Sequence, residues 1–406
     1  MRSSSIPDPS VDDDWREIAS HWDVRKDTCY LNHGSFGISP REVLQCRREW
    51  QDRLDAQPMD YYLRQLEPAF YDTRKTLGGF LNAEPENLVF VENSTYGMNV
   101  IANSFPLQKG DEVLLTSHEY GAVKRIWERK CRAVKSTCTS AELQVPFRDD
   151  TQILDSIFQA VTSKTKLLVV SHITSETGTI LPVREICERA RQLGIATCID
   201  GPHAPAQVEL DLRELDCDFY TASCHKWLCA TLGSGFLFVN PQWQSYIEPL
   251  VQSWGRLNPN QPQTWDEEFI WMGTRDPAPF FAVAKAIEFL DSIGFDHFRR
   301  RTRYLADTAL DVLIELFGTQ PLYPIHSEST RRWYGSMCEL PLPDHLSAEE
   351  KSTLQSRLWN HHQIEVPVFE FAGQKLLRVS FHLYNSRSDI DKLVSALTEE
   401  GCRPVS

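Results

Sequence analysis

Long hydrophobic runs are missing from this sequence of 406 residues. A membrane-spanning helix needs roughly 20 consecutive apolar residues, whereas runs such as Leu167–Val170 are far shorter. The N-terminal segment MRSSSIPDPSVDDDW also lacks the apolar stretch of a secretory signal and soon becomes acidic. We therefore expect no membrane partner and a cytoplasmic location.

An excess of basic residues is missing as well. Lysine and arginine together number 42, whereas aspartate and glutamate number 56, so the formal net charge is −14. Proteins that bind nucleic acids through phosphate contacts need clustered positive charge, and this balance argues against a nucleic-acid partner. A small anionic ligand remains compatible with the composition, because it needs only a local positive site.

The sequence also lacks the motifs of common metal and dinucleotide sites. Its 11 cysteines include no C-x-x-C pair, and no H-E-x-x-H is present, so we expect no metal centre and reduced, mostly buried thiols. The pair His361-His362 is interpreted as a surface feature. A nicotinamide enzyme is expected to carry G-x-G-x-x-G, but no third glycine follows Gly233-Ser234-Gly235 at that spacing.

The sequence does contain the pattern of an α/β protein. Between about residues 87 and 240, short Val- and Leu-rich runs alternate with helical patterns, as is typical of a parallel sheet covered on both faces. After Pro277 the pattern changes and predicts a smaller α+β domain. The expected strands are 88–91, 113–116, 166–171, 195–200, 218–222, 235–239, 336–340, 364–369 and 376–381. The expected helices include 96–105, 183–193, 279–293 and 296–316, with others starting at 348 and 388.

We predict three segments along the chain. Residues 1–30 form an N-terminal arm, of which the first 14 are rich in Ser, Pro and Asp and are expected to be loose. Residues 31–277 form the large α/β domain, whose N-terminal part also contributes to the small domain. Residues 278–406 form the small C-terminal domain.

Two charged residues follow expected strands where an open α/β sheet binds its ligands. Lys226 comes after strand 218–222 and is suited to forming a Schiff base with an aldehyde, although a surface lysine on a turn is the ordinary alternative. Asp200 ends strand 195–200, where it can bind metal, cap a turn or pair with a protonated ring nitrogen. Together they form the arrangement that pyridoxal 5′-phosphate (PLP) chemistry needs, because the lysine holds the aldehyde and the aspartate keeps the pyridine nitrogen protonated.

A third segment, Glu92–Gly97, follows strand 88–91 and opens a helix. Ser94 and Thr95 offer hydroxyls and backbone N–H groups where a phosphate would bind, and the helix dipole favours the anion. An ordinary Ser/Thr helix cap is the alternative. The position before the first crossover of the same sheet favours the phosphate site.

From Leu31 to about Leu397 the chain resembles the fold-type I PLP enzymes of aminotransferase class V. This family includes the cysteine desulfurases, the selenocysteine lyases and the isopenicillin N epimerase-like proteins. The resemblance implies a fold-type I PLP-transferase with a large, mostly parallel seven-stranded sheet, and PLP as cofactor. The segments that carry it are Asn93–Asn99, Ser171–Ser175, Asp200–His203, and Asp216–Tyr220 with Ser223–Lys226.

The resemblance also implies roles for residues around the cofactor. Lys226 is expected to be the Schiff-base lysine, Asp200 the partner of the pyridinium nitrogen, and His203 a hydrogen-bond partner of the ring hydroxyl. Tyr120 is placed like the residue that stacks on the ring, where desulfurases usually have His. Ser175 stands in the ring-oxygen loop, where the family usually has Asn. The residues expected to hold the phosphate are Ser94, Thr95, Ser223 and His225.

Three further residues are assigned by the resemblance to the substrate or to a second subunit. Thr274, in Gly273–Asp276, resembles the threonine donated to the cofactor phosphate of the neighbouring subunit, which implies a homodimer with shared active sites. Arg378 matches the arginine that grips the substrate carboxylate with its planar fork. Asn32 lies in Asn32–Gly37, which is similar to the loop that closes over the substrate; a Gly-rich turn without a ligand is the alternative.

The absence of a nucleophilic cysteine narrows the set of possible reactions. Desulfurases need a cysteine shortly before the substrate arginine, but residues 339–400 contain none, and Val366-Pro367-Val368 occupies that region. The motifs H-x-T-S, D-G-x-H and G-T-R-D are most similar to the isopenicillin N epimerase-like branch. We therefore expect epimerase or racemase chemistry at the α-carbon of an amino acid or an amino-acid-containing molecule, with Lys226 removing the α-proton. A C–S lyase acting by β-elimination and a class V aminotransferase remain open. A non-catalytic binding protein is disfavoured, because Lys226 and Asp200 are both present.

Overall fold

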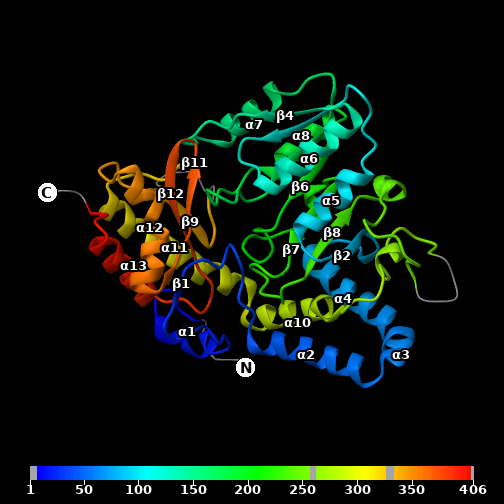
Figure 1. Cartoon of the computed structure of the whole chain (residues 1–406), viewed down its shortest axis with the longest axis horizontal. Helices are drawn as coiled ribbons and strands as arrows, with labels where there is room; N and C mark the ends of the chain where they lie inside the picture. Colours follow the sequence, from blue (N-terminus) through cyan, green and yellow to red (C-terminus); the bar gives the residue numbers. More distant parts are fainter. Residues whose placement is uncertain (1–6, 257–261, 326–332, 404–406) are drawn as a thin grey trace.

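A seven-stranded sheet forms the centre of the computed structural model (Figure 1), which describes residues 7–256, 262–325 and 333–403. The strand order is β2-β8-β7-β6-β5-β3-β4. Strand β8 runs antiparallel to both of its neighbours, and every other pair is parallel. The strands are β2 (Leu88–Val91), β3 (Glu112–Thr116), β4 (Thr137–Ala141), β5 (Thr165–Ser171), β6 (Ala196–Asp200), β7 (Phe219–Ser223) and β8 (Gly235–Val239).

The sheet is buried on both faces, as its uninterrupted apolar strands predict. Along β5, Leu167 and Val169 belong to one hydrophobic core, whereas Leu168 and Val170 belong to the other. This alternation follows from the two-residue period of a strand. The helices between the strands are α5 (Ser94–Ser104), α6 (Gly121–Val134), α7 (Asp150–Gln159), α8 (Val183–Gln192) and α9 (Leu212–Leu215), with short 3₁₀ turns η2 (Pro85–Asn87), η3 (Pro241–Tyr246) and η4 (Glu267–Phe269).

Helices that precede the sheet strands in the sequence pack beside the sheet with a helix that follows them. Helix α10 (Ala278–Ile293) contacts α2 (Arg41–Ala56) and α4 (Leu66–Leu81), and Figure 1 shows the three side by side. The chain between α2 and α4 forms α3 (Pro58–Asp60) and a π-helical turn, η1 (Tyr61–Gln65).

The N-terminal segment is more ordered than we expected. Residues 1–6 lie outside the described residues, but helix α1 (Asp12–Ala19) begins within the stretch predicted to be loose, and that prediction is wrong from Asp12 onward. The indole of Trp15 is buried, and Asp12 forms an ion pair of 2.5 Å with the buried Arg301 of the C-terminal part. A buried arginine needs an anionic partner, and α1 supplies it.

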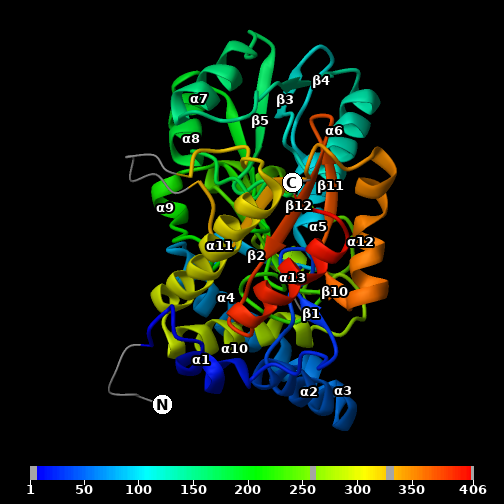
Figure 2. The ribbon, with the colours of Figure 1, turned by 90° about the vertical axis from the view of Figure 1, so that its left-hand side faces the viewer.

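The C-terminal part contains a three-stranded antiparallel sheet, β11-β12-β9, and four further elements. Strand β1 (Cys29–Tyr30) pairs in parallel with β10, so the segment after α1 lies against this part of the chain. Figure 1 shows the C-terminal part on one side of the large sheet, and Figure 2 looks directly at it. Its elements are α11 (Phe295–Phe317), β9 (Met337–Pro341), α12 (Ala348–His362), β10 (Ile364–Glu365), β11 (Val368–Phe371), β12 (Gln374–Ser380) and α13 (Arg387–Glu399).

The α/β architecture with a large mixed, mostly parallel sheet is thus confirmed, although the short strand β1 was not expected and two further strand assignments differ. Strand β4 has no counterpart among the expected strands, and the expected strand 364–369 is divided into β10 and β11. In the described part of the chain, no helix has both the length and the apolar character needed to cross a membrane.

Candidate active site

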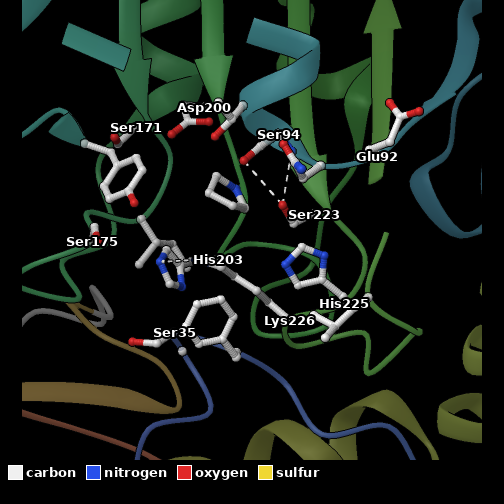
Figure 3. A pocket seen from close by; sticks show the side chains of 18 of the residues that line it. Ser35, Glu92, Ser94, Ser171, Ser175, Asp200, His203, Ser223, His225 and Lys226 are labelled. Carbon is white, nitrogen blue, oxygen red and sulfur yellow. Dashed lines mark hydrogen bonds between the residues drawn. The ribbon is translucent and has the colours of Figure 1, made fainter. Parts of the chain in front are cut away.

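A cavity of about 600 Å³ opens at the carboxyl ends of the parallel strands. Ser171, Asp200 and Ser223 are the last residues of β5, β6 and β7, and all three line it. The loop Gly34–Phe36 and residues of β11 and β12 line it from the other side. The cavity therefore lies between the large sheet and the C-terminal part, and Figure 3 shows the side chains that point into it.

Lys226 is the basic group at the floor of the cavity. Its Nζ lies 3.2 Å from Nε2 of His203, and both side chains are drawn toward the same space in Figure 3. Burial, followed by the positive charge of Arg378, lowers the pKa of Lys226 from 10.5 to about 7. A lysine with such a pKa is largely uncharged just above neutral pH, and an uncharged amine is the form that attacks an aldehyde.

Asp200 is an almost fully buried carboxylate that faces the same cavity. Burial, and then the nearby charge of Glu119, raises its pKa to about 7. None of the described residues donates a hydrogen bond to the Asp200 carboxylate. The neighbouring Glu119 carboxylate, by contrast, accepts hydrogen bonds from Thr116 Oγ1 (2.7 Å) and Ser171 Oγ (2.7 Å). A buried carboxylate without a partner is costly, and a cationic group bound in the cavity would satisfy it.

The N-terminus of α5 forms a polar cradle at the cavity wall. The backbone N–H of Ser94 donates to Ser223 Oγ (3.1 Å), and the two hydroxyls lie 3.3 Å apart. Asn93 caps the helix by accepting from the Tyr96 N–H at 2.9 Å. Hydroxyls and N–H groups at a helix N-terminus bind anions well.

A glycine lets α5 lie against the sheet below this cradle. A Cβ atom on Gly97 would stand 2.1 Å from Thr221 Oγ1. Only a residue without a side chain permits that approach, so Gly97 fixes where the helix N-terminus meets the cavity.

Arg378 of β12 is a buried cation held by neutral acceptors. Its guanidinium donates to Ser35 Oγ (2.9 Å), to Asn32 Oδ1 (3.3 Å) and to the Ser175 carbonyl, and it lies over the Phe369 ring at 4.8 Å. Burial lowers its pKa to about 10, so it stays charged at neutral pH. Within the described ranges no carboxylate hydrogen-bonds to it, which leaves it suited to a carboxylate brought by a substrate.

The structure brings most of the predicted site residues together. The cavity is lined by Ser94, Thr95, Tyr120, Ser175, Asp200, His203, Ser223, His225, Lys226 and Arg378. Asn32 is not part of the lining and contacts the cavity through Arg378. Thr274 is exposed and lies outside the lining. Its neighbour Arg275 binds Glu92, a residue of the cavity wall, at 2.8 Å, so the loop of Thr274 is anchored close to the site.

Several lining residues were not singled out as site residues from the sequence. Phe36 and Leu232 are more than half exposed at the cavity, and Phe369 lies under Arg378. Glu92 belongs to the segment Glu92–Gly97, which the sequence predicts to lie at the end of a strand. The sequence therefore indicates that Glu92 lies near the site, but it does not indicate the ion pair with Arg275. The apolar residues carry no sequence signal, because an isolated Phe or Leu on a loop is indistinguishable from ordinary packing.

Among the described residues, the cluster of His and carboxylate side chains close enough to share a metal ion lies outside the cavity. None of the residues that line the cavity is a cysteine. His361 and His362, predicted to be a surface pair, are exposed and half-buried, and both bind Glu400 Oε1, at 3.0 and 2.9 Å. Arg357 pairs with the other oxygen of that carboxylate, so the cluster is an ion-pair network between α12 and the end of α13.

The donor set of the cavity fits PLP. A partly buried amine of low pKa is available for the aldehyde, and the unpartnered Asp200 carboxylate suits the protonated ring nitrogen. The Ser94 and Ser223 hydroxyls at the α5 N-terminus suit the phosphate.

Comparisons with known proteins identify the family of this chain. The model of the family "Aminotransferase class-V" matches residues 30–393. An isopenicillin N epimerase from Amycolatopsis lactamdurans is 35% identical over 383 residues, covering 91% of this chain and 94% of that protein. A probable chloroplastic L-cysteine desulfhydrase from Arabidopsis thaliana is 26% identical, covering 93% and 83%.

Among solved structures, the cysteine desulfurase CsdA from Escherichia coli superposes with a TM-score of 0.79 at 19% identity, covering 95% of this chain and 98% of that one. At that identity the likeness concerns the fold. The family match spans most of the sequence, and the fold agrees with it. The chain therefore belongs to the aminotransferase class-V family of enzymes, and its cofactor is pyridoxal 5′-phosphate.

Proposed function

We propose that this protein is a PLP-dependent enzyme of the isopenicillin N epimerase type, which inverts the configuration at the α-carbon of an amino acid or an amino-acid-containing small molecule. The observation that carries the proposal is that Lys226, a partly buried amine with a pKa of about 7, shares one cavity with the buried cation Arg378, and that none of the lining residues is a cysteine. The epimerase relatives, 35% and 33% identical, support the same assignment.

Each residue has a definite task in this proposal. When bound, PLP supplies an aldehyde for an amino group and a ring that accepts electrons from the α-carbon. Arg378 orients the substrate by holding both carboxylate oxygens. Lys226 Nζ takes up the α-proton, since it is neutral just above pH 7. Asp200 holds a proton at the ring nitrogen, and the hydroxyls of Ser94 and Ser223 hold the phosphate.

A C–S lyase is the second candidate. The desulfhydrase relative, 26% identical over most of this chain, favours it. Removal of the α-proton by Lys226 is common to both reactions, so the residues described above serve either one. A persulfide-forming desulfurase is disfavoured, because residues 339–400 contain no cysteine and Val366-Pro367-Val368 occupies the region where it would lie. An aminotransferase would require a keto-acid partner and is tested in the same experiment.

The decisive experiment follows the α-hydrogen of a panel of amino acids in heavy water. The purified protein is incubated with L-amino acids, including cysteine derivatives, with and without an added keto acid, and NMR with chiral chromatography follows the products. We expect deuterium at the α-carbon with inverted configuration and no by-product. Release of pyruvate and a thiol would reject the epimerase assignment in favour of the lyase, and formation of other keto acids would favour the aminotransferase.

Two lysine variants test whether the exchange of the α-hydrogen depends on Lys226. Lys226→Ala is expected to lower α-hydrogen exchange by about 10³-fold or more, as for the removal of a catalytic base and nucleophile. Lys285→Ala, at a surface lysine that pairs with Glu288, should leave exchange unchanged. Persistence of exchange in Lys226→Ala would refute the mechanism.

A further inference from the structure

The indole of Trp227 is buried directly behind the catalytic cavity. Its Nε1–H donates to Nδ1 of His203 at 3.2 Å, and Nε2 on the other side of the same imidazole lies 3.2 Å from Lys226 Nζ. Trp227 is fully buried, and His203 is 1% exposed. The three side chains therefore form a continuous chain of polar contacts that runs from the protein interior to the cavity.

The donor and acceptor capacities of these three side chains determine which ring nitrogen of His203 carries the proton. An indole nitrogen can only donate, so Nδ1 of His203 must accept and carries no proton. Burial, together with the charges of Lys226 and Arg378, holds the pKa of His203 well below its ordinary value, so the ring is neutral. A neutral imidazole has one N–H, and in His203 it is therefore on Nε2, facing Lys226.

Two further histidines hold the Lys226–Trp227 backbone in place. Nε2 of His33 lies 3.0 Å from the Lys226 carbonyl, and Nε2 of His382 lies 3.3 Å from the Trp227 carbonyl. The two imidazoles stack with their centroids 4.2 Å apart, and both are fully buried. Carbonyl oxygens only accept, so each ring donates through Nε2. The direction of the Trp227 indole is thus set by a buried, tightly packed support.

We propose that Trp227 is a positioning residue that locks His203 in the Nε2–H tautomer, so that His203 always presents a hydrogen-bond donor to the cavity beside Lys226. In the free site the acceptor is the uncharged Lys226 amine; when PLP is bound, its ring oxygen would be the acceptor. The proposal rests on the proposed function only where it names the ring oxygen of PLP as acceptor. The tautomer itself follows from the contacts of His203 with Trp227 and Lys226.

The test is NMR of the full-length, cofactor-loaded protein labelled with ¹⁵N in its histidine rings. The two ring nitrogens of a neutral histidine have different shifts according to which one carries the proton. The His203 signals are identified by their loss in His203→Gln. We expect the wild-type protein to show the His203 proton on Nε2. This measurement does not depend on any variant at position 227. A bare Nε2, or a doubly protonated ring, would overturn the proposal.

Trp227→Phe tests the cause, because it keeps most of the ring volume and removes the N–H. We expect His203 to populate the Nδ1–H tautomer, the visible absorption band of the bound cofactor to shift, and kcat to fall about tenfold with a smaller change in KM, as for one lost hydrogen bond. Trp127→Phe is the matched control, since its indole is equally buried but contacts Met98 Sδ. An unchanged tautomer and band in Trp227→Phe would reject the proposal.

A second arm separates an effect of the His203 tautomer from a loss of packing, and the wild-type measurement still stands if Trp227→Phe folds poorly. In the His203→Gln background, where no tautomer exists, Trp227→Phe should shift the cofactor band by much less than it does in the wild type. Equal shifts in both backgrounds would assign Trp227 a packing role and overturn the proposal. Failure of the proposed function is distinguishable, because α-hydrogen exchange that survives in Lys226→Ala leaves the tautomer result unaffected.

Discussion

The environment of Lys226 predicts when the protein captures its cofactor. Burial is the largest cause of the lowered pKa of about 7, and the charge of Arg378 lowers it further. A lysine with a lowered pKa is neutral above that pKa, so the reactive amine is present from about pH 7 upward. We expect the rate at which the stripped protein captures PLP, followed by absorbance, to rise through about pH 7 and then level off.

A free lysine side chain, mixed with PLP as a reference, should continue to gain rate toward its pKa near 10.4. Arg378→Gln removes the neighbouring positive charge, and the midpoint for the protein should then move to higher pH. A wild-type profile that rises only near pH 10 would show that Lys226 is charged in the folded protein at neutral pH.

The geometry of Arg378 predicts a substrate-binding defect in Arg378→Lys. Lysine keeps the charge but loses the planar fork and the separate bonds to Ser35 and Asn32. We expect KM for the substrate to rise about 10- to 100-fold, which corresponds to the loss of a charge-assisted bond of about 1.5–3 kcal/mol. Steady-state kinetics measure the effect, and Arg184→Lys, at an exposed arginine paired with Glu214, should behave as the wild type. An unchanged KM would remove Arg378 from the substrate site.

Individual site residues could be predicted from the sequence where a polar residue ends an apolar strand. Asp200 follows a run of buried residues in β6, and Lys226 follows β7, so strand assignment and chemistry lead to both. The contacts that tune them could not be predicted. Trp227 meets His203 across 24 positions, and Arg378 meets Asn32 across 346, and such distant pairs depend on how whole elements pack.

At the scale of elements, the close contact of α5 with β7 predicts an intolerance of side chains at Gly97. A Cβ there would lie 2.1 Å from Thr221 Oγ1, so Gly97→Ala must displace the helix that carries Ser94. We expect a loss of about 1–3 kcal/mol in the free energy of unfolding, measured in urea, together with weaker PLP binding. Gly79→Ala in α4 is the control, because no atom lies within 4 Å of its Cβ, and it should be neutral or stabilising by up to about 1 kcal/mol. Equal stability of both variants would contradict the packing argument.

The elements that the sequence predicted well are those with apolar runs. Strands β2 and β8 have the expected bounds, and β3, β6 and β7, which are also buried throughout, differ from the expected bounds by one residue at one or both ends. Strand β4, Thr137–Ala141, was missed because it lies at the sheet edge, is only partly buried and has the sequence TCTSA, which contains no apolar run. Strands β10 and β11 were merged because Val366 and Pro367 continue the apolar character, whereas proline interrupts strand pairing.

At the scale of the whole molecule, the position of Thr274 favours a homodimer with shared active sites, which we propose and which remains to be tested. Thr274 is exposed, yet its neighbour Arg275 is bound to Glu92 at the cavity wall. Around the same cavity, Phe36 is 64% and Leu232 55% exposed. Exposed apolar side chains around a site are typical of a surface that a partner covers.

Subunit complementation tests this arrangement directly. Lys226→Ala lacks the catalytic amine, and Thr274→Asp places a carboxylate that repels phosphate, so each variant alone should have little activity. If Thr274 serves the partner's site, a mixed dimer has one site with the intact lysine from one chain and the intact threonine from the other. We therefore expect activity to return when the two variants are unfolded and refolded together, to about a quarter of the wild-type level for random pairing with one active site in each mixed dimer. Sedimentation should give about twice the chain mass of 46.7 kDa. No recovery in dimers that demonstrably mix would place Thr274 outside the partner's site, and a monomer would refute shared sites altogether.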